Sequence, residues 1–315
     1  MNQELNPKRI KLFKKLNEAV EESKRSRIRR LLNKPVSTLI NSAVHKLLKY
    51  GHLEIAHKVK IKTFWGKKII TILSAYSDLW RCGAYINDPE VRLTRFLIKN
   101  TKEKGVFFDI GANIGYYSLL VSNIASGVKI FSFEPDPFNI RLLISNKEAN
   151  IDIIQKAVGR ENGNADFYVS TKANSGISTL KLKNRDLLEK RNFKKMNVKL
   201  VTMDTFCKET RRVPNLIKID VEGAEEDVLK GGSRTLKEAD PTIIMEVWCT
   251  PFTENYRNAL KILKKAGFKC FSIEEEGTLK ERDYKKIEDY FKELQEKYIS
   301  IRDSSNFDNL VFMKG

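Results

Sequence analysis

Acidic residues in this sequence stand where a small-molecule binding site would need them. The first, Asp109, follows three apolar residues and precedes two glycines in the stretch Asp109-Ile-Gly-Ala-Asn-Ile-Gly115. A dinucleotide-binding turn reads G-x-G-x-x-G and carries its acid only at the end of the following strand. The order D-x-G-x-N-x-G instead places a carboxylate beside the glycine turn. There it suits a cationic group such as an α-amine and would repel a pyrophosphate.

A second acid, Glu134, ends the next apolar stretch, Lys129 to Phe133. A carboxylate at this point can accept hydrogen bonds from both hydroxyls of a ribose. Gly111 permits backbone angles that other residues avoid and lets a ligand approach the main chain. Gly115 opens a helix whose free N–H groups face that ligand. An amine site and a ribose site together describe S-adenosylmethionine, which we expect as the cofactor.

Further acids follow two later apolar stretches, and their position suits catalysis because ligands bind at the carboxyl ends of parallel strands. A hydroxyl acceptor gains from a base that takes its proton as the new bond forms. A histidine base is not expected, since His45, His52 and His57 all precede the predicted sheet. We therefore expect a carboxylate to act, and the candidate catalytic residues are Asp220, Glu222 and Glu246.

Two neighbours of these acids are candidates for contact with the acceptor. Trp248 ends an apolar stretch, and its ring could stack on a sugar. Glu225 is the other candidate, although an acid in the first turn of a helix is also favoured by the helix dipole. The same carboxylates could instead bind a divalent cation, which takes oxygen ligands. The sequence leaves that alternative open, and we assign no metal ligands.

Strands and helices must alternate to position these residues, which predicts an α/β fold with a mostly parallel, doubly wound sheet. Before the sheet we expect a hairpin and a helix over residues 90–99. The expected strands are the one ending at Asp109 and then 128–134, 151–158, 165–170, 198–202, 216–220, 242–248, 268–273 and 309–313. The expected helices are 116–124, 137–149, 224–229 and 254–266, with a helical insertion at 281–299.

Charge and pattern divide the chain into three expected segments: a basic helical extension at 1–58, a hairpin and helix at 59–100, and a catalytic domain at 101–315. Residues 1–68 carry eighteen Lys and Arg against five Glu, and so hold most of the formal charge of +18. Such a segment suits an anionic membrane surface or a partner subunit. A lysine-rich face that is simply solvated is the plain alternative.

The cysteines and the hydropathy pattern bear on the compartment. Cys82, Cys207, Cys249 and Cys270 show no C-x-x-C spacing, which is typical of buried thiols in a reducing environment. The first thirty residues lack the apolar run of a signal peptide. No stretch approaches the ~20 apolar residues that span a bilayer. We expect a cytoplasmic protein, soluble or peripheral on the inner face of the membrane.

The motifs together resemble the FkbM-type methyltransferases, a branch of the S-adenosylmethionine-dependent Rossmann-like enzymes. The matching stretches are Asp109-Ile-Gly-Ala-Asn-Ile-Gly-Tyr-Tyr-Ser118, Phe133-Glu-Pro-Asp-Pro-Phe-Asn139, Ala157-Val-Gly159, Thr202-Met-Asp204 and Ile217-Lys-Ile-Asp-Val-Glu-Gly-Ala-Glu225. The resemblance covers roughly residues 60–315. It implies a class I methyltransferase fold with an antiparallel last strand, and O-methylation of a saccharide or another metabolite.

The resemblance also implies roles for individual residues. The amino-acid end of the cofactor would lie on Asp109, Gly111, Asn113 and Gly115, and its ribose on Glu134. The adenine would lie beside the turn that follows. The remaining implied cofactor contacts are Tyr116, Pro135, Asp136, Asn139 and Ala157. The segment Gly176-Ile-Ser-Thr179 resembles a stretch that family members carry near the cofactor. It lacks the double glycine of that stretch, so we assign it no cofactor contact.

Three alternative functions compete with glycan methylation. RNA methylation would explain the basic N-terminal segment, but Asp220-Val-Glu-Gly223 stands where a base-amine methylase would carry N-P-P-Y, and its acids would repel a phosphate backbone. Nucleic acid is therefore a disfavoured partner. A non-catalytic scaffold in a glycan-assembly complex is a second alternative, which the intact glycine turn disfavours. A nicotinamide oxidoreductase is the third, and the glycine spacing argues against it.

Overall fold

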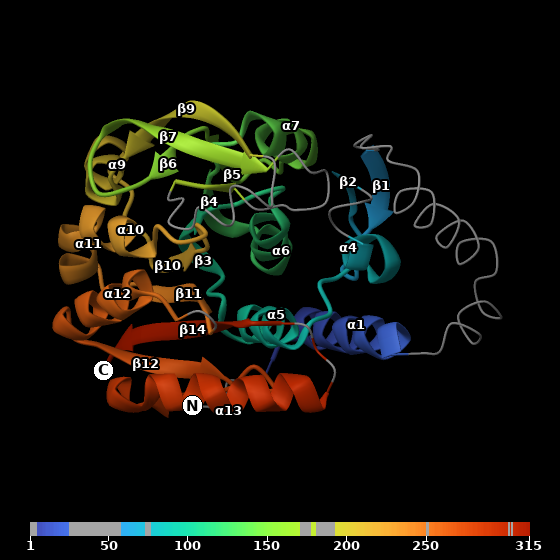
Figure 1. Ribbon diagram of the computed structural model, residues 1–315. Coiled ribbons are helices and arrows are strands. Elements are labelled where there is room, and N and C mark those ends of the chain that lie inside the picture. The colour runs from blue at the N-terminus through green and yellow to red at the C-terminus, as the bar shows by residue number, and fades with distance from the viewer. Residues whose placement is uncertain are drawn as a thin grey trace. The chain divides into compact units, whose positions relative to one another are not determined.

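The computed structural model describes residues 5–24, 58–72, 77–170, 178–180, 193–249, 252–301, 303 and 305–315 (Figure 1). The described residues up to Ile86 fall in one compact unit, and nearly all those from Asn87 onward fall in a second. Residues 25–57, which make up most of the helical extension expected at 1–58 and include the three histidines, lie outside the described residues.

The smaller unit contains α1 (Pro7–Lys24), β1 (Lys58–Lys62), β2 (Lys68–Ile72) and α4 (Ser77–Cys82). Helix α1 buries an apolar stripe at three- and four-residue spacing, which includes Leu12 and Leu16. The expected hairpin is confirmed, because β1 and β2 pair antiparallel with Lys62 opposite Lys68. None of the helices in the described part of the chain combines the length and the apolar character that a bilayer crossing requires.

The larger unit is built on an eight-stranded sheet of order β13-β12-β14-β11-β10-β3-β4-β5. The five strands from β11 to β5 run parallel, and β14 runs antiparallel to both of its neighbours. Their bounds are β3 (Lys104–Ile110), β4 (Gly127–Phe133), β5 (Ile151–Ile154), β10 (Leu216–Ile219), β11 (Thr242–Trp248), β12 (Phe268–Ile273), β13 (Leu279–Arg282) and β14 (Phe307–Lys314). The expected mostly parallel sheet with an antiparallel last strand is confirmed.

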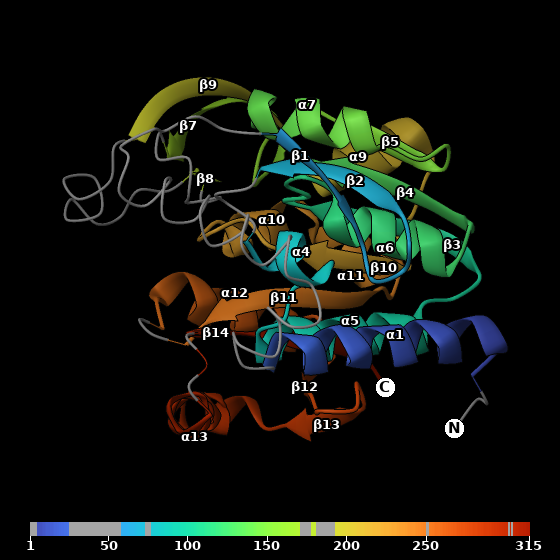
Figure 2. The same ribbon diagram turned by 90° about the vertical axis from the view of Figure 1, so that its right-hand side faces the viewer.

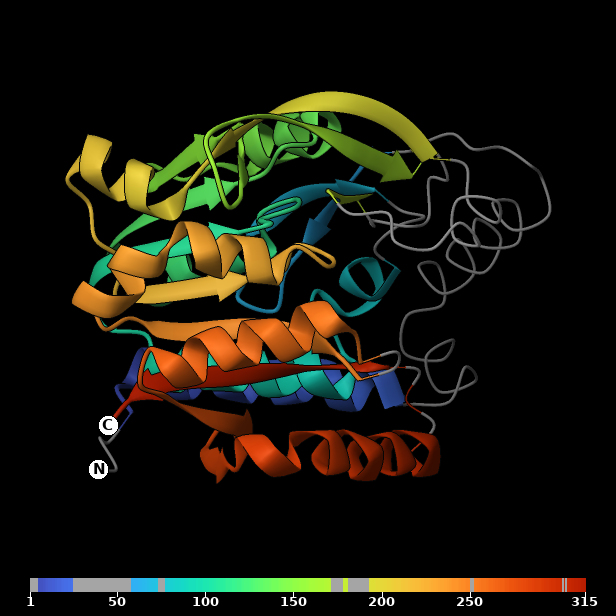
Figure 3. The ribbon, with the colours of Figure 1, turned by 60° about the vertical axis from the view of Figure 1, so that its left-hand side comes forward.

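Helices cover both faces of this sheet, as a doubly wound fold requires. Helices α5, α6 and α7 lie on one face, and α10 and α12 lie on the other (Figures 1 and 2). The helix bounds are α5 (Asp88–Asn100), α6 (Tyr116–Ile124), α7 (Pro137–Asn146), α9 (Met203–Thr210), α10 (Glu225–Gly231), α11 (Ser233–Glu238), α12 (Glu254–Lys265), the 3-10 turn η1 (Tyr284–Lys286) and α13 (Ile287–Ser300). Figure 3 shows α10 and α12 side by side over β10 and β11.

Two expected elements are corrected by the structure. The strand expected over 151–158 divides into β5 and β6 (Ala157–Val158), because Lys156 N–H donates to Ile154 O at 2.8 Å and turns the chain. Strand β6 then joins a separate four-stranded sheet of order β6-β9-β7-β8, with β7 (Gly163–Ser170), β8 (Ser178–Thr179) and β9 (Phe193–Val201). The insertion expected as a helix over 281–299 begins with β13 and η1, so α13 starts only at Ile287.

Aromatic residues bridge the sheet and α9 in the centre of the larger unit. The Phe108 ring on β3 meets Phe133 on β4 edge to face, with centroids 5.4 Å apart, and Phe206 on α9 at 5.5 Å. The Phe133 and Phe206 centroids are 4.8 Å apart. Such pairs stabilise a core beyond the area that they bury. They hold the carboxyl ends of β3 and β4 in fixed register, and Asp109 and Glu134 follow Phe108 and Phe133 directly.

A buried arginine fixes helix α5. Arg92 is 3% exposed, and its guanidinium donates to Asp308 Oδ1 on β14 and to the Tyr298 hydroxyl on α13, each at 2.9 Å. It also donates to the carbonyl of Ile273 and, at 2.8 Å, to Asp88 Oδ2 on its own helix. One side chain therefore joins α5, α13 and two strands of the sheet.

Candidate active site

Four parallel strands end at one edge of the large sheet and bring the predicted site residues together. Ile110 at the end of β3 is opposite Phe133 of β4 and Ile219 of β10, and Ile219 is in turn opposite Met245 of β11. The acids that end these strands therefore share one edge, as expected for ligand sites in such sheets.

The glycine turn after β3 is shaped by contacts within the chain. The amide N–H groups of Gly111 and Ala112 both donate to the carbonyl of Phe133 at 2.9 Å. Gly111 has φ +85°, and a Cβ there would lie 1.9 Å from the carbonyl oxygen of Asp220. Glycine was expected here to let a ligand approach, but the atom that approaches the backbone is this carbonyl. The requirement for glycine thus ties the turn to β10.

Asp109 is positioned to receive a partner that the described chain does not supply. It is 1% exposed, and Ser118 Oγ on α6 donates to its Oδ2 at 2.6 Å. Its Oδ1 is also buried and accepts no hydrogen bond from any described residue. Burial raises the pKa of the Asp109 carboxyl, and the charge of Lys218 acts in the opposite direction. A buried oxygen without a donor fits a cationic ligand group such as an ammonium.

Glu134 is oriented by the main chain on both sides. Its Oε2 accepts from Asn113 N–H at 2.8 Å, and its Oε1 accepts from Asp136 N–H at 2.9 Å. Asn113 adopts φ +53° in the turn. Burial raises the pKa of Glu134 to about 7, although these hydrogen bonds lower it. The Asn139 side chain is a third donor, so about one of the carboxylate's roughly four lone-pair sites is left to accept from a hydroxyl.

Four of the other predicted cofactor residues follow Glu134 or the glycine turn in the chain, and the fifth, Ala157, lies in the separate four-stranded sheet. Asp136 caps α7, accepting from Phe138 N–H at 2.8 Å, and Pro135 lies between it and Glu134. Asn139 is buried in the first turn of α7 and hydrogen-bonds to Glu134 through its side chain. Tyr116 begins α6 directly after Gly115, and Ala157 lies buried in β6. Their cofactor contacts stay predictions.

A buried lysine stands at the centre of the acidic edge. Lys218 on β10 is 3% exposed, and its Nζ lies 2.8 Å from Asp220 Oδ2 and 4.8 Å from the centre of the Tyr117 ring. Burial lowers the pKa of this ammonium, but the charges of Asp220 and Asp109 outweigh burial and raise it. Lys218 therefore remains charged and holds one oxygen of Asp220 in place.

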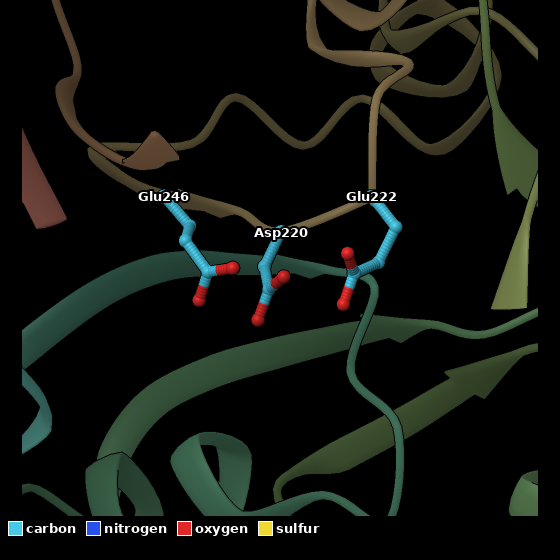
Figure 4. A group of neighbouring side chains, drawn as sticks. All are labelled: Asp220, Glu222 and Glu246. Carbon is cyan, nitrogen blue, oxygen red and sulfur yellow. The ribbon is translucent and has the colours of Figure 1, made fainter. Parts of the chain in front are cut away.

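Asp220, Glu222 and Glu246 converge at the same edge. Each offers a carboxylate oxygen within 4.8 Å of the others, and Figure 4 shows the three side chains pointing the same way. Burial, followed by the charges of Asp220 and Glu222, raises the pKa of Glu246 well above its usual range. Like charges this close cannot all ionise without a proton or a cation between them. The group can accept a proton or hold a divalent cation, and no ion is assigned to it.

Two residues predicted to contact the acceptor take different positions. Trp248 lies beside the acids, and its Nε1 donates to Glu246 Oε1 at 3.2 Å. Glu225 is 1% exposed, with Oε1 accepting from Gly223 N–H at 3.1 Å and Oε2 from Asn255 Nδ2 at 2.5 Å. These bonds favour a structural role for Glu225 in fixing the loop that carries Glu222. Within the segment 176–179, Gly176 and Ile177 lie outside the described residues, and Ser178 and Thr179 form β8.

Sequence reasoning missed three residues of this site. Lys218 could have been found from the sequence, because a lysine inside the apolar strand Leu216–Ile219 is buried and must then find a charged partner. Ser118 ends the matching stretch that begins at Asp109, and its hydroxyl holds the Asp109 carboxylate in place. Glu90 on α5 had no signal, since an acid in the first turn of a helix is ordinary.

The fold and the site define the class of protein. An open parallel sheet completed by an antiparallel strand next to its last parallel strand, with acids at its carboxyl edge, is a Rossmann-like methyltransferase fold. Residues 109–270, just over half of the chain, match the family model described as the methyltransferase FkbM domain. The chain belongs to this family and is a methyltransferase.

Relatives and solved structures resemble parts of the chain. It is 25% identical over 177 residues to the hexuronic acid methyltransferase AglP of Haloferax volcanii, covering 55% of this chain and 67% of that protein. Methyltransferase FkbM from Methylobacillus flagellatus is 19% identical with a TM-score of 0.33, covering 46% of this chain and 33% of the other. The chain thus spans a third of that protein's length. The structure of P. horikoshii TYW2 in complex with MeSAdo is 11% identical with a TM-score of 0.39, and the match covers 83% of this chain and 73% of that one.

Proposed function

We propose that this chain transfers a methyl group from S-adenosylmethionine to a hydroxyl of a saccharide or glycan. The observation that carries the proposal is the shared edge of four strands. It holds a buried carboxylate oxygen without a donor on Asp109, an oriented carboxylate on Glu134 and a convergent acid group at Asp220. These groups match an amine, a ribose and a hydroxyl acceptor.

The cofactor would be held by groups that are already in position. Asp109 Oδ1 would accept from its α-ammonium, and the lone pair left on Glu134 would accept from a ribose hydroxyl. When bound, S-adenosylmethionine supplies an electrophilic methyl group. The chain's contribution is to align donor and acceptor and to exclude water.

The acceptor hydroxyl would lie against the acid group. Asp220 Oδ2 is fixed by Lys218, which leaves its other oxygen to orient the hydroxyl. Glu222 adds negative charge that favours removal of the hydroxyl proton. The raised pKa of Glu246 instead suits it to hold a proton beside them. The relative AglP supports a saccharide as the acceptor, because its name gives hexuronic acid as the compound that it methylates. We also propose that the glycan is linked to a lipid or lies on the cell surface.

Comparison of the glycans of cells with and without the gene tests the proposal. Mass spectrometry should find glycans that are lighter by one methylene unit in cells without it. Restoring the gene should restore the mass. Identical glycans in both strains, together with a methylated ribosomal or transfer RNA nucleoside that disappears with the gene, would replace a glycan by RNA as the acceptor.

We predict that Glu134→Gln and Asp109→Asn weaken binding of the cofactor by about 10- to 100-fold, since a hydrogen bond to a charged group contributes ~1.5–3 kcal/mol. In Glu134→Gln an amide NH₂ would also face the N–H of Asn113 or Asp136. Isothermal calorimetry with S-adenosylmethionine measures the effect.

The matched controls for these variants carry the same changes at exposed positions. Asp166→Asn alters a half-exposed acid on β7, and Glu293→Gln alters an exposed acid on α13; both should bind like the unaltered chain. Equal affinity of the Glu134 variant and its control would remove Glu134 from the cofactor site.

We further propose that residues 1–58 form an extension of the catalytic domain. Together with the hairpin that follows in the sequence, this extension binds an anionic membrane surface. Lys58, Lys60 and Lys62 lie at alternate positions of β1 and are all exposed, and exposed Lys68 is opposite Lys62. The described residues offer these four side chains no ion pair. Helix α1 adds exposed Lys8, Lys11 and Lys14.

We predict that Lys58, Lys60 and Lys62 changed together to Glu lower the binding of the whole chain to anionic phospholipid vesicles at least 10-fold. Each basic residue near such a surface is worth about 1 kcal/mol. Sedimentation with phosphatidylglycerol vesicles measures it, and added salt should weaken the unaltered chain's binding. Lys102, Lys208 and Lys237, all exposed in the larger unit, changed to Glu are the control. Equal losses in both triple variants would contradict a specific surface.

A further inference from the structure

Glu90 is an acid of this site to which the description above gives no role. It lies in the first turn of α5 and precedes the residues that match the family model, which begin at Asp109. Its Oε2 is buried and accepts no hydrogen bond from any described residue. A buried carboxylate oxygen without a donor is costly, so its presence needs a reason.

Helix capping does not provide that reason. Glu90 is the third residue of α5, where a glutamate often reaches back to the N–H of the capping residue. No such bond joins it to Asn87, and the Asn87 side chain makes no capping hydrogen bond either. The residue as a whole keeps partial exposure, so it borders a space that solvent can enter.

The helix that carries Glu90 is held rigidly. Two residues further along, Arg92 is bound to Asp308, to the Tyr298 hydroxyl and to the carbonyl of Ile273. Asp308 also accepts from the Tyr290 hydroxyl at 2.5 Å. The Arg92 guanidinium is committed to these acceptors and does not donate to Glu90 Oε2. The first turn of α5 cannot shift to give Glu90 a donor without breaking this network.

The charged groups that act on Glu90 belong to the candidate active site. Burial raises the pKa of Glu90 to about 7, with Lys218 on β10 lowering it and Asp220 raising it. Glu90 acts in turn on Glu246 of β11. Helix α6, the neighbour on the same face, contributes the Tyr117 ring, which covers Lys218. Glu90 thus belongs to the helical layer, whereas the acids that act on it or are acted on by it follow the strands.

We propose that Glu90 is a further catalytic residue that contacts the acceptor hydroxyl and takes its proton. The acceptor oxygen forms a bond to the methyl carbon while the carbon–sulfur bond of the donor breaks, and the sulfur keeps that electron pair. The hydroxyl proton passes to the Glu90 carboxylate. Asp220, bound to Lys218, orients the same hydroxyl. This inference rests on the proposed function.

The variant Glu90→Gln keeps the shape of the side chain and removes the base. Transfer of labelled methyl from S-adenosylmethionine to the glycan pool of cells that lack the gene should fall about 100-fold, within the usual effect of general base catalysis. Affinity for S-adenosylmethionine should not change. Glu90→Asp should recover part of the rate. Glu293→Gln, exposed on α13, is the control with full transfer.

A second measurement does not depend on activity. Between pH 4.5 and 7 the folded chain keeps a proton on Glu90 that the unfolded chain has lost, so this group's contribution to stability falls as pH rises through that window. Glu90→Gln should therefore raise the melting temperature relative to the unaltered chain above pH 7, and by less near pH 4.5. Glu293→Gln should show no such difference.

The outcomes separate the two proposals. If the unaltered chain labels no glycan, the proposed function fails and this inference fails with it. If the unaltered chain and Glu90→Gln label the glycan equally well, the inference alone is wrong. Destabilisation by Glu90→Gln to the same extent at both pH values would assign Glu90 a structural role and overturn the inference.

Discussion

Replacing Asp220 by Asn should slow methyl transfer by about 10²- to 10⁴-fold and leave the affinity for S-adenosylmethionine nearly unchanged. The reason lies in the position of Asp220 between Lys218, which holds its Oδ2 at 2.8 Å, and the acids Glu222 and Glu246. An amide keeps the shape but loses the charged oxygen that orients the acceptor hydroxyl toward the methyl group. Single-turnover labelling of the glycan pool from cells that lack the gene measures the rate.

The Asp220 variant also removes the charged partner of Lys218, and the effect of this loss on stability needs its own control. Without its carboxylate, Lys218 becomes a buried charge with a weakened partner, which alone is destabilising. Changing Lys218 to Met in the same chain should recover stability without recovering the rate. Asp166→Asn should transfer normally. A rate that returns with the double variant would show that Asp220 serves the fold alone.

Replacing Arg92 by Ala should lower the free energy of unfolding by about 3–5 kcal/mol, the usual loss when a buried ion pair is broken. The variant leaves Asp308 as a buried carboxylate, 0% exposed, whose donors among the described residues are then the Tyr290 hydroxyl and the Asn309 N–H. It also removes the link from α5 to α13. Urea unfolding followed by circular dichroism measures the loss.

The control for the Arg92 variant is the same change at an exposed arginine that also pairs with a carboxylate. Arg257 pairs with Glu288 at 2.9 Å on the surface, and such pairs contribute at most about 1 kcal/mol. Arg257→Ala should therefore unfold at nearly the unaltered urea concentration. If the Arg92 and Arg257 variants lose the same small amount, the Arg92 network does not fix α5, and the rigid placement of Glu90 loses its support.

The sequence predicted those parts of the site that depend on local order along the chain. Asp109, the glycine turn and Glu134 follow apolar stretches, and the carboxyl ends of neighbouring parallel strands must meet at one edge. The same reasoning placed Asp220 and Glu246 together. Periodicity also predicted most strands and helices within a few residues.

The sequence could not predict contacts made between distant elements. Gly111 is required by the carbonyl of Asp220, which approaches from another strand. The charge on Lys218 is kept by acids from several elements, and the burial of Glu90 depends on how α5 packs. The turn at Lys156, which moves Ala157 into another sheet, has no glycine or proline to signal it.

Calorimetric titration of the purified chain with S-adenosylmethionine tests most directly whether the carboxyl edge is a methyl-donor site. We predict a clear heat of binding with this compound and with its demethylated product, and none with NAD⁺, whose pyrophosphate Asp109 would repel. Binding of NAD⁺ without binding of either adenosyl compound would contradict the assignment of Asp109 and Glu134, and with it the proposed reaction.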